Sequence, residues 1–351
     1  MDRLSALGLI FLIGFGGAAL STPLAMRLGE RWGLVDRPGG RRRHPRPVSR
    51  LGGLGLAVGF FLAWFASLTL VRFPGLQTHD PRWIGLMIGA LFVMAVGVAD
   101  DALDLSPRAQ YAGYLAAALI ALAFGIRLDS FNNPLNNQYV YLPLALAIPL
   151  TVLWVTGMIV TVNWLDGLDG LATSVSSILT AVLTVHVLRT AYPSIAPVTT
   201  ALLGAGAGFL VFNLPPARVF LGSNGAFFIG YLLAGLGILA GGRVATVLLV
   251  MGIPILDTAW TIGERLREHQ DARRGDRRHL HYRLLDSGLS NRQILALYVG
   301  FGVIFGAINL LISPRLLKLA LLTALVTGTF GLLRWLSSRK ALPHAQEARD
   351  A

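Results

Sequence analysis

The polar stretch Asn163-Trp164-Leu165-Asp166-Gly167-Leu168-Asp169-Gly170-Leu171-Ala172 separates two long apolar runs, one beginning near Val140 and the other ending near Val187. As a helix, a run of about 20 apolar residues is long enough to cross the ~30 Å hydrocarbon layer of a membrane. The sequence therefore predicts two membrane-spanning helices joined by a short polar turn. Because two aspartates and an asparagine at a membrane edge are costly in apolar surroundings, we expect this turn to bind a ligand.

The spacing and the residue types of the turn indicate which ligand. Asn163, Asp166 and Asp169 are three residues apart, which spreads their side chains over one side of a helical segment. Gly167 and Gly170 leave the backbone open to close approach. Carboxylate and amide oxygens suit a hard cation such as Mg²⁺, which commonly bridges to substrate phosphates. An ordinary polar turn is the alternative, because Asp, Asn and Gly all favour turns.

The composition of the 351-residue chain is that of a multi-spanning membrane protein. The chain is 54% hydrophobic and 14% charged, whereas soluble domains carry about 25% charged residues. With no cysteine, it has neither disulfides nor thiol chemistry. The net charge of +12 is consistent with basic cytoplasmic loops and with attraction to anionic lipids or phosphorylated substrates. We expect no binding of nucleic acid, because no basic soluble domain is present to carry it.

The apolar runs predict an all-α, polytopic integral membrane protein with about 11 transmembrane helices. We expect residues 1–336 to form a single transmembrane domain and residues 337–351 to form a cytoplasmic C-terminal tail. The first apolar run lacks a convincing small-residue cleavage site, so we predict a retained span rather than a signal peptide. The predicted spans are 4–26, 51–71, 82–99, 111–127, 140–162, 170–188, 195–214, 225–241, 243–262, 292–313 and 315–336.

Charges in the loops predict the orientation of the chain. Arginines are concentrated in two basic segments, residues 27–50 and 263–291. The positive-inside rule places both in the cytoplasm, so that with 11 spans the N-terminus lies outside and the C-terminus inside. The same alternation puts residues 100–110, 163–169 and 215–224 on the cytoplasmic side. We therefore expect these polar segments to form one site on the cytoplasmic face of the cell membrane.

Three further segments carry chemically active side chains. The adjacent carboxylates of Asp100 and Asp101 repel each other, and a divalent cation would relieve that repulsion; a solvated helix end is the alternative. His279 and His281 suit phosphate binding or proton transfer. Their spacing also suits Zn²⁺, although the neighbouring arginines argue against a cation, and a basic loop on anionic headgroups is a third interpretation. Residues 41–53 are either a basic part of the site or a positive-inside anchor.

Taken in order, these segments resemble those of the polyprenyl-phosphate N-acetylhexosamine-1-phosphate transferase family over about residues 30–300. The most specific match is Asn163-x-x-Asp166-Gly167-x-Asp169-Gly170-Leu171-Ala172. The matching segments look closer to the branch that uses UDP-GlcNAc than to the MurNAc-pentapeptide branch, which stays open as an alternative. The other matching segments are Asp36-x-Pro38 with His44 to Gly53, Asp100-Asp101 with Leu105-Ser106-Pro107, Ile253-Pro254-Ile255-Leu256-Asp257-Thr258, and Asp276-Arg277-x-His279-Leu280-His281.

The resemblance implies that residues 1–336 are a catalytic membrane domain. In the implied reaction, the phosphate of a polyprenyl phosphate attacks the sugar-bearing phosphate of a UDP-sugar, giving a polyprenyl-diphospho-sugar and UMP. This is the first membrane step of a cell-envelope glycan pathway. The implied cofactor is Mg²⁺, with Mn²⁺ as an alternative. The expected partners are the lipid phosphate, the UDP-sugar and anionic membrane lipids, and a homodimer stays open.

The resemblance also implies roles for individual residues. Asp100 or Asp101 would accept a proton from the lipid phosphate or orient it. Asp166 and Asp169, also counted as catalytic, would hold groups of the donor, and Asn163 would ligate Mg²⁺. The remaining substrate-binding residues are Arg43, His44, Arg50, His279, His281 and Arg283.

The chain departs from the family pattern at four positions. Ser223 stands where the family has a metal-binding Asp, which makes the neighbouring Asn224 a candidate substitute ligand. Gln110 replaces a Lys, Tyr282 a His and Ser49 a Pro. The departure at position 223 keeps open a degenerate relative that binds lipid phosphate without turnover. A transporter or flippase would place charges near the bilayer midplane, and an aromatic prenyltransferase would space its aspartates four apart, so both fit less well.

The predicted topology can be tested because the chain has no cysteine of its own. Single cysteines introduced into residues 100–110, 163–169 and 215–224 should react with a membrane-impermeant maleimide only after the membrane is opened. Cysteines in the two basic segments should behave in the same way. A cysteine in the loop near 128–139 is the control and should react in intact cells. Labelling of any of the first five segments from outside would contradict the predicted orientation.

Overall fold

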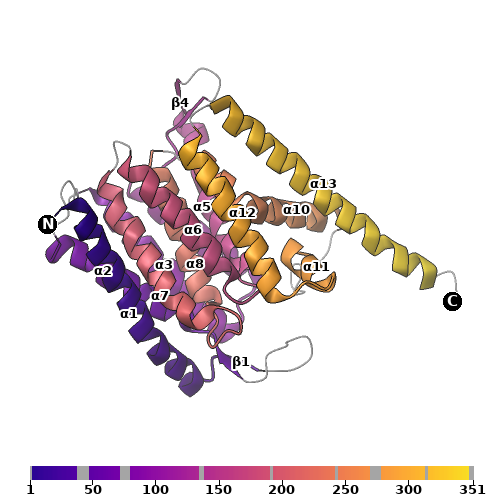
Figure 1. The fold of residues 1–351 in the computed structure, drawn as a ribbon, viewed down its shortest axis with the longest axis horizontal. Coiled ribbons are helices and arrows are strands. Elements are labelled where there is room, and N and C mark those ends of the chain that lie inside the picture. Colours follow the sequence, from indigo (N-terminus) through magenta and orange to yellow (C-terminus); the bar gives the residue numbers. More distant parts are fainter. Residues whose placement is uncertain are drawn as a thin grey trace.

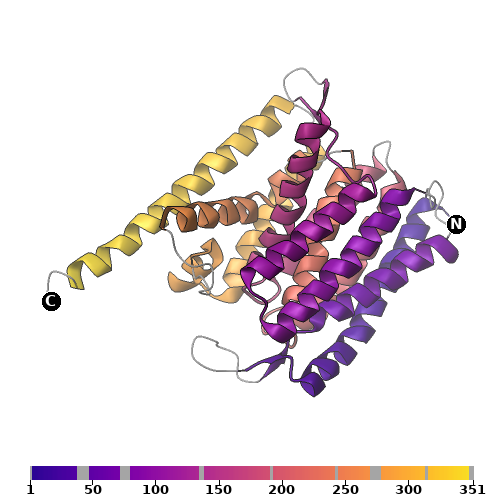
Figure 2. The same cartoon turned by 180° about the vertical axis from the view of Figure 1, so that it is seen from behind.

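The computed structural model of the chain describes residues 2–37, 47–71, 80–133, 138–189, 193–241, 244–268, 278–312 and 315–347. Within these ranges the chain is a bundle of helices with two short strand pairs (Figures 1 and 2), which confirms the predicted all-α membrane class. The helices are α1 (Arg3–Trp32), α2 (Gly52–Thr69), α3 (Pro81–Leu103), α4 (Pro107–Ala123), α5 (Leu144–Leu165), α6 (Leu171–Leu188), a 3-10 turn at Pro193–Ile195, α7 (Ala196–Asn213), α8 (Gly222–Leu239), α9 (Val244–Val250), α10 (Gly252–Glu268), α11 (Leu280–Asp286), α12 (Asn291–Leu311) and α13 (Arg315–Glu347).

In the described part of the chain, nine helices are long and apolar enough to cross a membrane, and the bent pair α9–α10 adds a tenth if it is one span. Each overlaps a predicted span. The remaining prediction, 111–127, overlaps α4, which has 17 residues. Large apolar side chains such as Leu12, Leu20 and Phe65 are exposed on the outside of the bundle. Such a surface suits contact with lipid tails, which are as apolar as leucine.

Helix α8 forms the core of the bundle. Of its 18 residues, 89% are buried, mainly against α3, α5 and α2. The hydroxyl of Tyr231 donates a hydrogen bond to the Gly85 carbonyl at 3.1 Å, and Trp154 Nε1 donates to the Ala234 carbonyl at 3.1 Å. Polar groups inside a membrane protein need partners of this kind because the lipid offers none. These contacts hold the middle of α8 against α3 and α5.

The predicted span 243–262 is not one continuous helix, and this corrects the sequence analysis. The axes of α9 and α10 differ by 85°, with Met251 between them. Pro254 has no N–H to donate, so it is tolerated in the first turn of a new helix but disrupts a continuous one. Beyond the bend, α10 packs against α5 and α13 (Figure 1). The bend brings Asp257 to α11, where its carboxylate accepts a hydrogen bond from the Leu280 N–H at 2.8 Å.

The two strand pairs lie at opposite ends of the bundle (Figure 1). Strands β1 (Val35–Asp36) and β2 (Val48–Ser49) pair antiparallel at the base of the first basic segment. Strands β3 (Ser130–Asn132) and β4 (Tyr139–Tyr141) form the second pair. Strands of two or three residues are too short to show an alternating apolar pattern, and the sequence analysis predicted neither pair.

Two glycines let neighbouring helices approach the start of α8. A Cβ at Gly97 of α3 would lie 2.5 Å from the Cα of Asn224, and a Cβ at Gly53 of α2 would lie 2.2 Å from the Cα of Gly225. Neither position has room for a side chain, so both helices pack directly on the backbone of α8. Small residues allow this close approach in membrane bundles. It brings the polar ends of α2, α3 and α8 together.

The close packing at Gly97 predicts a measurable cost. Gly97→Ala should lower the free energy of unfolding by about 1–3 kcal/mol, because the added methyl group overpacks the α3–α8 contact. The matched control is Gly157→Ala in α5, where an added Cβ meets nothing within 4 Å, so stability should be unchanged or higher by up to about 1 kcal/mol. Thermal unfolding of the detergent-solubilised proteins measures both. Equal melting temperatures for the two variants would contradict the packing described here.

Candidate active site

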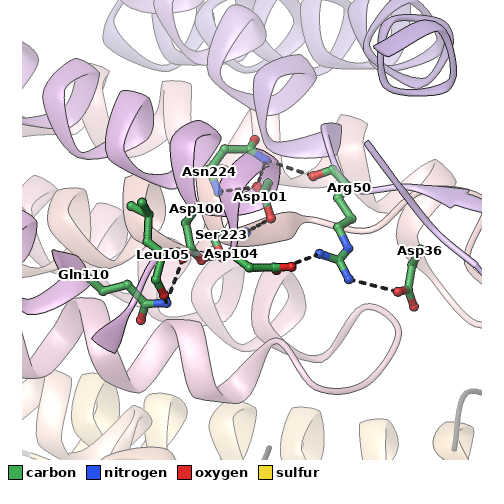
Figure 3. Close-up of polar contacts among 9 residues, drawn as sticks. All are labelled: Asp36, Arg50, Asp100, Asp101, Asp104, Leu105, Gln110, Ser223 and Asn224. Carbon is green, nitrogen blue, oxygen red and sulfur yellow. Dashed lines mark hydrogen bonds and ion pairs between the residues drawn. The ribbon is translucent and has the colours of Figure 1, made fainter. Parts of the chain in front are cut away.

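The aspartate pair predicted to be catalytic lies where α3 ends. Asp104 closes the helix in the left-handed conformation, with φ of 46°, and Ser106 caps the next helix, which begins with Pro107. Asp100 is 9% exposed and Asp101 is half-buried. Figure 3 shows both carboxylates close to the first residues of α8.

Asp101 binds the N-terminus of α8. Its carboxylate accepts hydrogen bonds from the backbone N–H groups of Ser223 at 3.1 Å and Asn224 at 3.0 Å, and from Asn224 Nδ2 at 2.6 Å. The first N–H groups of a helix have no partner within it, and the helix dipole favours a negative charge there. Asn224 Nδ2 also donates to the Arg50 carbonyl at 2.8 Å. One carboxylate therefore joins α3 and α8 to the segment that leads into α2.

Asp100 is held by two neutral donors. Ser223 Oγ donates to Asp100 Oδ2 at 2.6 Å, and Gln110 Nε2 donates to Asp100 Oδ1 at 2.7 Å (Figure 3). Positions 110 and 223 are two of the four at which the chain departs from the family pattern. Both departures therefore act on the same carboxylate.

Arg50, predicted to bind substrate, lies beside the aspartate pair. Its guanidinium is 3.0 Å from Asp36 Oδ1, on β1, and 3.8 Å from Asp104 Oδ1, at the end of α3 (Figure 3). These contacts tie the first basic segment to the aspartate pair. The other two predicted residues of this segment, Arg43 and His44, lie outside the described residues.

The turn between α5 and α6 carries two more of the predicted aspartates. Asp166 follows directly after α5 and lies near the N–H of Gly222 and the carboxylate of Asp101. Burial, reinforced by the charge of Asp101, raises the pKa of Asp166 well above its usual range. Asp169 Oδ2 accepts a hydrogen bond from the Ala217 N–H at 3.0 Å. The turn is thus fixed against the connection between α7 and α8.

The donor set around this turn fits a divalent cation. The negative charge of Asp101 disfavours ionisation of Asp166, and a cation between the two would relieve that repulsion. Asn163, half-buried in the last turn of α5, makes no side-chain hydrogen bond within the described ranges, so its amide oxygen is available. No cluster of three or more His, Asp or Glu side chains suited to a metal occurs among these residues. Mg²⁺ needs no such cluster, because it usually takes one or two protein carboxylates and completes its shell with substrate phosphates and water.

The two candidate metal ligands on α8, Ser223 and Asn224, make side-chain hydrogen bonds within the protein, whereas Asn163 makes none in the described ranges. Ser223 Oγ is engaged as a donor to Asp100. Asn224 donates through Nδ2, and its Oδ1 is buried beside Gly53 with no hydrogen-bond partner in the part of the chain that the structure describes. Their proposed role as metal ligands stays a prediction.

His279 lies in a second polar cluster, formed by α5, α10 and α11. It is the residue before α11, and its Nδ1 is 2.9 Å from Asp257 Oδ2. Its ring centroid is 5.0 Å from that of Trp164, over which the guanidinium of Arg265 is stacked at 4.6 Å. Because Trp164 directly follows Asn163, this cluster adjoins the turn that carries Asp166.

His281 packs on the other side of the same turn. Its ring is parallel to that of His279, with centroids 5.6 Å apart, and it is 1% exposed with neither ring nitrogen hydrogen-bonded among the described residues. Burial, together with His279, lowers the pKa of His281 to about 3, so the ring is neutral at physiological pH. Tyr282, where the family has a His, donates from its hydroxyl to the Gly167 carbonyl at 3.3 Å.

Arg283, the last predicted phosphate ligand, is buried. Its guanidinium is 3.0 Å from Glu264 Oε2 on α10 and also donates to the carbonyls of Arg278 and Leu333. In this structure it joins α11 to α10 and α13. Its predicted role in phosphate binding stays a prediction.

The sequence analysis assigned no role to Asp257, Glu264, Trp164 or Arg265, although the structure places them around the predicted histidines. Asp257 was named only as part of the matching segment 253–258, without a role, because it falls within a predicted span. The signal that could have found it is Pro254, three residues earlier, which marks the start of a helix rather than its middle. No comparable signal in the sequence connects Arg265 with Trp164.

The chain is similar to known proteins over the residues of this site. Residues 83–241, which include the aspartate pair, the α5–α6 turn and the start of α8, match the model of glycosyl transferase family 4. A probable undecaprenyl-phosphate N-acetylglucosaminyl 1-phosphate transferase of Bacillus subtilis is 29% identical over 327 residues, covering 91% of this chain and 88% of the relative. A decaprenyl-phosphate N-acetylglucosaminephosphotransferase of Mycobacterium tuberculosis is 28% identical, covering 90% of this chain and 86% of the relative.

A third relative extends the similarity to another bacterial group. The undecaprenyl-phosphate alpha-N-acetylglucosaminyl 1-phosphate transferase of Haemophilus influenzae is 28% identical over 86% of both chains. These relatives agree with the resemblance seen in the sequence motifs, and they extend it over most of the chain. The chain is thus similar to glycosyl transferase family 4 over residues 83–241, and to polyprenyl-phosphate N-acetylglucosamine-1-phosphate transferases over most of its length.

Proposed function

We propose that this protein transfers a sugar-1-phosphate, and most specifically GlcNAc-1-phosphate, from UDP-GlcNAc to a polyprenyl phosphate. One observation carries the proposal: Asp100, Asp101 and Asp166 lie close together where α3 and α5 end and α8 begins. The chain that holds them has helices long and apolar enough to cross a membrane. The names of the relatives support the same substrates.

The reaction exchanges one phosphoanhydride bond for another. An oxygen of the lipid phosphate forms a bond to the phosphorus that carries the sugar. The bond from that phosphorus to the bridging oxygen breaks, and its electron pair leaves with UMP. Phosphoryl transfer of this kind needs positioning and charge neutralisation more than covalent help from the protein.

The residues of the aspartate pair suit the acceptor side of this reaction. Asp100 or Asp101 takes a proton from the lipid phosphate or orients it, and the neutral donors Ser223 and Gln110 hold Asp100 in place for that step. Asp166 and Asp169 hold groups of the donor. His279, His281 and Arg283 bind phosphate, with Arg43, His44 and Arg50 contributing from the first basic segment.

We propose Mg²⁺ as the cofactor, held by Asn163 and Asp166 with Asp101 beside them. When bound, the ion neutralises the charge of the diphosphate. Ser223 and Asn224 remain candidate ligands from α8, and Mn²⁺ suits the same oxygen donors.

The proposed substrates also suggest where the protein works. A polyprenyl phosphate is confined to the membrane and a UDP-sugar to the cytoplasm, so the site faces the cytoplasm at the cell membrane. The arginine-rich segments 27–50 and 263–291 then lie against anionic headgroups, which attract such segments by about 1 kcal/mol per basic residue near the surface. Residues 1–336 are the catalytic domain in this proposal, residues 337–351 are its tail, and a homodimer is compatible with it.

The first test is turnover of radiolabelled UDP-GlcNAc by the purified protein with undecaprenyl phosphate and Mg²⁺. Asp100→Asn, Asp101→Asn, Asn163→Ala and Asp166→Asn should each lower the rate by about 10²-fold or more, because each group acts on developing charge or on the metal. The matched control is Asp129→Asn, which changes an exposed aspartate next to β3 and should leave the rate unchanged.

Three outcomes would contradict the proposed site or function. Near-native rates for all four variants would remove the acidic cluster from the reaction. Binding of undecaprenyl phosphate without any turnover by the unaltered protein would make the chain a degenerate relative. Turnover of UDP-MurNAc-pentapeptide instead of UDP-GlcNAc would assign it to the other substrate branch.

A second test concerns Ser223. Its Oγ is 2.6 Å from Asp100 Oδ2, so a carboxylate at this position would repel Asp100 unless a cation lay between them. Ser223→Asp should therefore lower the Mg²⁺ concentration needed for half-maximal rate. It should also make the melting temperature rise more steeply with Mg²⁺, because a ligand stabilises the state that binds it. Ser223→Ala is the control and should leave the Mg²⁺ dependence unchanged. An unchanged dependence in Ser223→Asp would mean that position 223 does not face the metal.

A further inference from the structure

A buried aspartate on α10 has no role in the mechanism described so far. Asp257 is 4% exposed, and each of its carboxylate oxygens has one partner. Oδ2 is 2.9 Å from His279 Nδ1, and Oδ1 accepts the Leu280 N–H at 2.8 Å. One carboxylate therefore contacts both a predicted phosphate-binding histidine and the backbone of the next residue.

These two contacts fix the chemical state of His279 as well as its position. A neutral imidazole carries its proton on one nitrogen and accepts through the other. Because a carboxylate can only accept, His279 carries a proton on Nδ1, and Nε2 is the nitrogen left for another ligand. When the ring is protonated on both nitrogens, Nε2–H can donate to an anionic ligand. No hydrogen bond to Nε2 is formed within the part of the chain that the structure describes.

The surroundings prevent the ring from turning away. Trp164 packs on His279 with centroids 5.0 Å apart, and His281 is stacked parallel to it. Thr261 Oγ1 lies 3.5 Å from the same Nδ1. His281 differs, because its two ring nitrogens have no hydrogen-bond partner among the described residues. Of the two histidines, only His279 is held by a carboxylate.

Packing alone does not explain a buried carboxylate at position 257, because burying it costs desolvation free energy. A buried charge pays a desolvation penalty that an apolar side chain of similar size avoids. His279 is the residue before α11, a helix of seven residues. The 85° bend before α10 is what brings Asp257 within reach.

We propose that Asp257 is a positioning residue for the transfer reaction: it accepts the Nδ1–H of His279 and so directs Nε2 to a substrate phosphate, where the ring protonated on both nitrogens donates its Nε2–H to a phosphate oxyanion. The inference rests on the proposed function for its substrates. The oxyanion belongs to the UDP-sugar or to the lipid phosphate, and these share the chemistry that His279 recognises. Carboxylate partners that orient a histidine in this way typically matter by about 10–100-fold where a histidine binds a metal.

A double-mutant cycle tests the coupling. Asp257→Asn should lower kcat/KM by about 10–100-fold, and His279→Gln by at least as much. In the double variant the loss should not exceed that of His279→Gln alone, because Asp257 acts through His279. Multiplied losses would overturn the proposal, since they would mean that Asp257 acts only by supporting the fold. In His279→Gln, the KM should rise for one substrate, UDP-GlcNAc or undecaprenyl phosphate, and that substrate is the one whose phosphate His279 binds. Unchanged kinetics in His279→Gln would also overturn the proposal.

The matched control is Thr258→Val. Thr258 is buried next to Asp257 on α10 and makes no hydrogen bond in the described ranges. This variant has nearly the same volume and should leave kcat/KM unchanged. Melting temperatures of all variants show whether a loss of activity follows a loss of fold.

A measurement without turnover separates this inference from the proposed function. In ¹⁵N-histidine NMR of the protein in nanodiscs, the His279 signals, assigned by their absence in His279→Gln, should show a proton on Nδ1. In Asp257→Asn that state should no longer be held. A ring protonated on Nε2 alone in the unaltered protein would overturn the proposal whether or not the protein is active. Lack of turnover combined with the Nδ1 signal would contradict the proposed function and leave the positioning of His279 by Asp257 established.

Discussion

The arrangement of the site depends on one carboxylate that binds the N-terminus of a buried helix. Asp101 accepts the backbone N–H groups of Ser223 and Asn224, which α8 cannot satisfy internally. In a bundle surrounded by lipid these groups have little access to water, so the partner must come from the protein. Gly97 and Gly53 make the contact sterically feasible, because they let α3 and α2 reach the backbone of α8. Together with the Ser223–Asp100 hydrogen bond, this contact fixes the aspartate pair relative to the start of α8.

The α5–α6 turn then connects two polar clusters that come from distant parts of the sequence. On one side, Asp166 lies near Asp101 and the N–H of Gly222. On the other, the Gly167 carbonyl accepts the hydroxyl of Tyr282, and His281 packs beside it. A side chain at Gly167 would occupy the space of His281, so the glycine is required for α11 to dock. The acidic cluster and the histidine cluster are therefore neighbours because one short turn contacts both.

Much of this could be predicted from the sequence, because hydrophobic runs and loop charges follow directly from the membrane as solvent. The spans and the polar segments at their ends needed no knowledge of packing. The break before α10 was missed because hydropathy measures how apolar a segment is and carries no information on its direction. Asp257 was therefore placed inside a span. Hydrogen-bond partners such as Gln110 and Ser223 for Asp100 could not be predicted either, because they depend on how α3, α4 and α8 pack together.

The two departures at Asp100 have a common physical meaning. Where the family pattern has a Lys and an Asp, this chain has Gln110 and Ser223, so one positive and one negative charge are absent together and the local net charge is conserved. Both replacements are neutral donors to Asp100, and α8 supplies the donors to Asp101. The aspartate pair is thus held by hydrogen bonds from the protein, unlike sites in which the metal itself supplies the folding energy. Asp166 differs, because it is half-buried and close to Asp101, with the Gly222 N–H as its donor in the described part of the chain. Of the three carboxylates, that of Asp166 would be stabilised most by a bound cation, whether the cation is alone or bound to a phosphate. Asp166 lies in the segment where this chain keeps the family pattern.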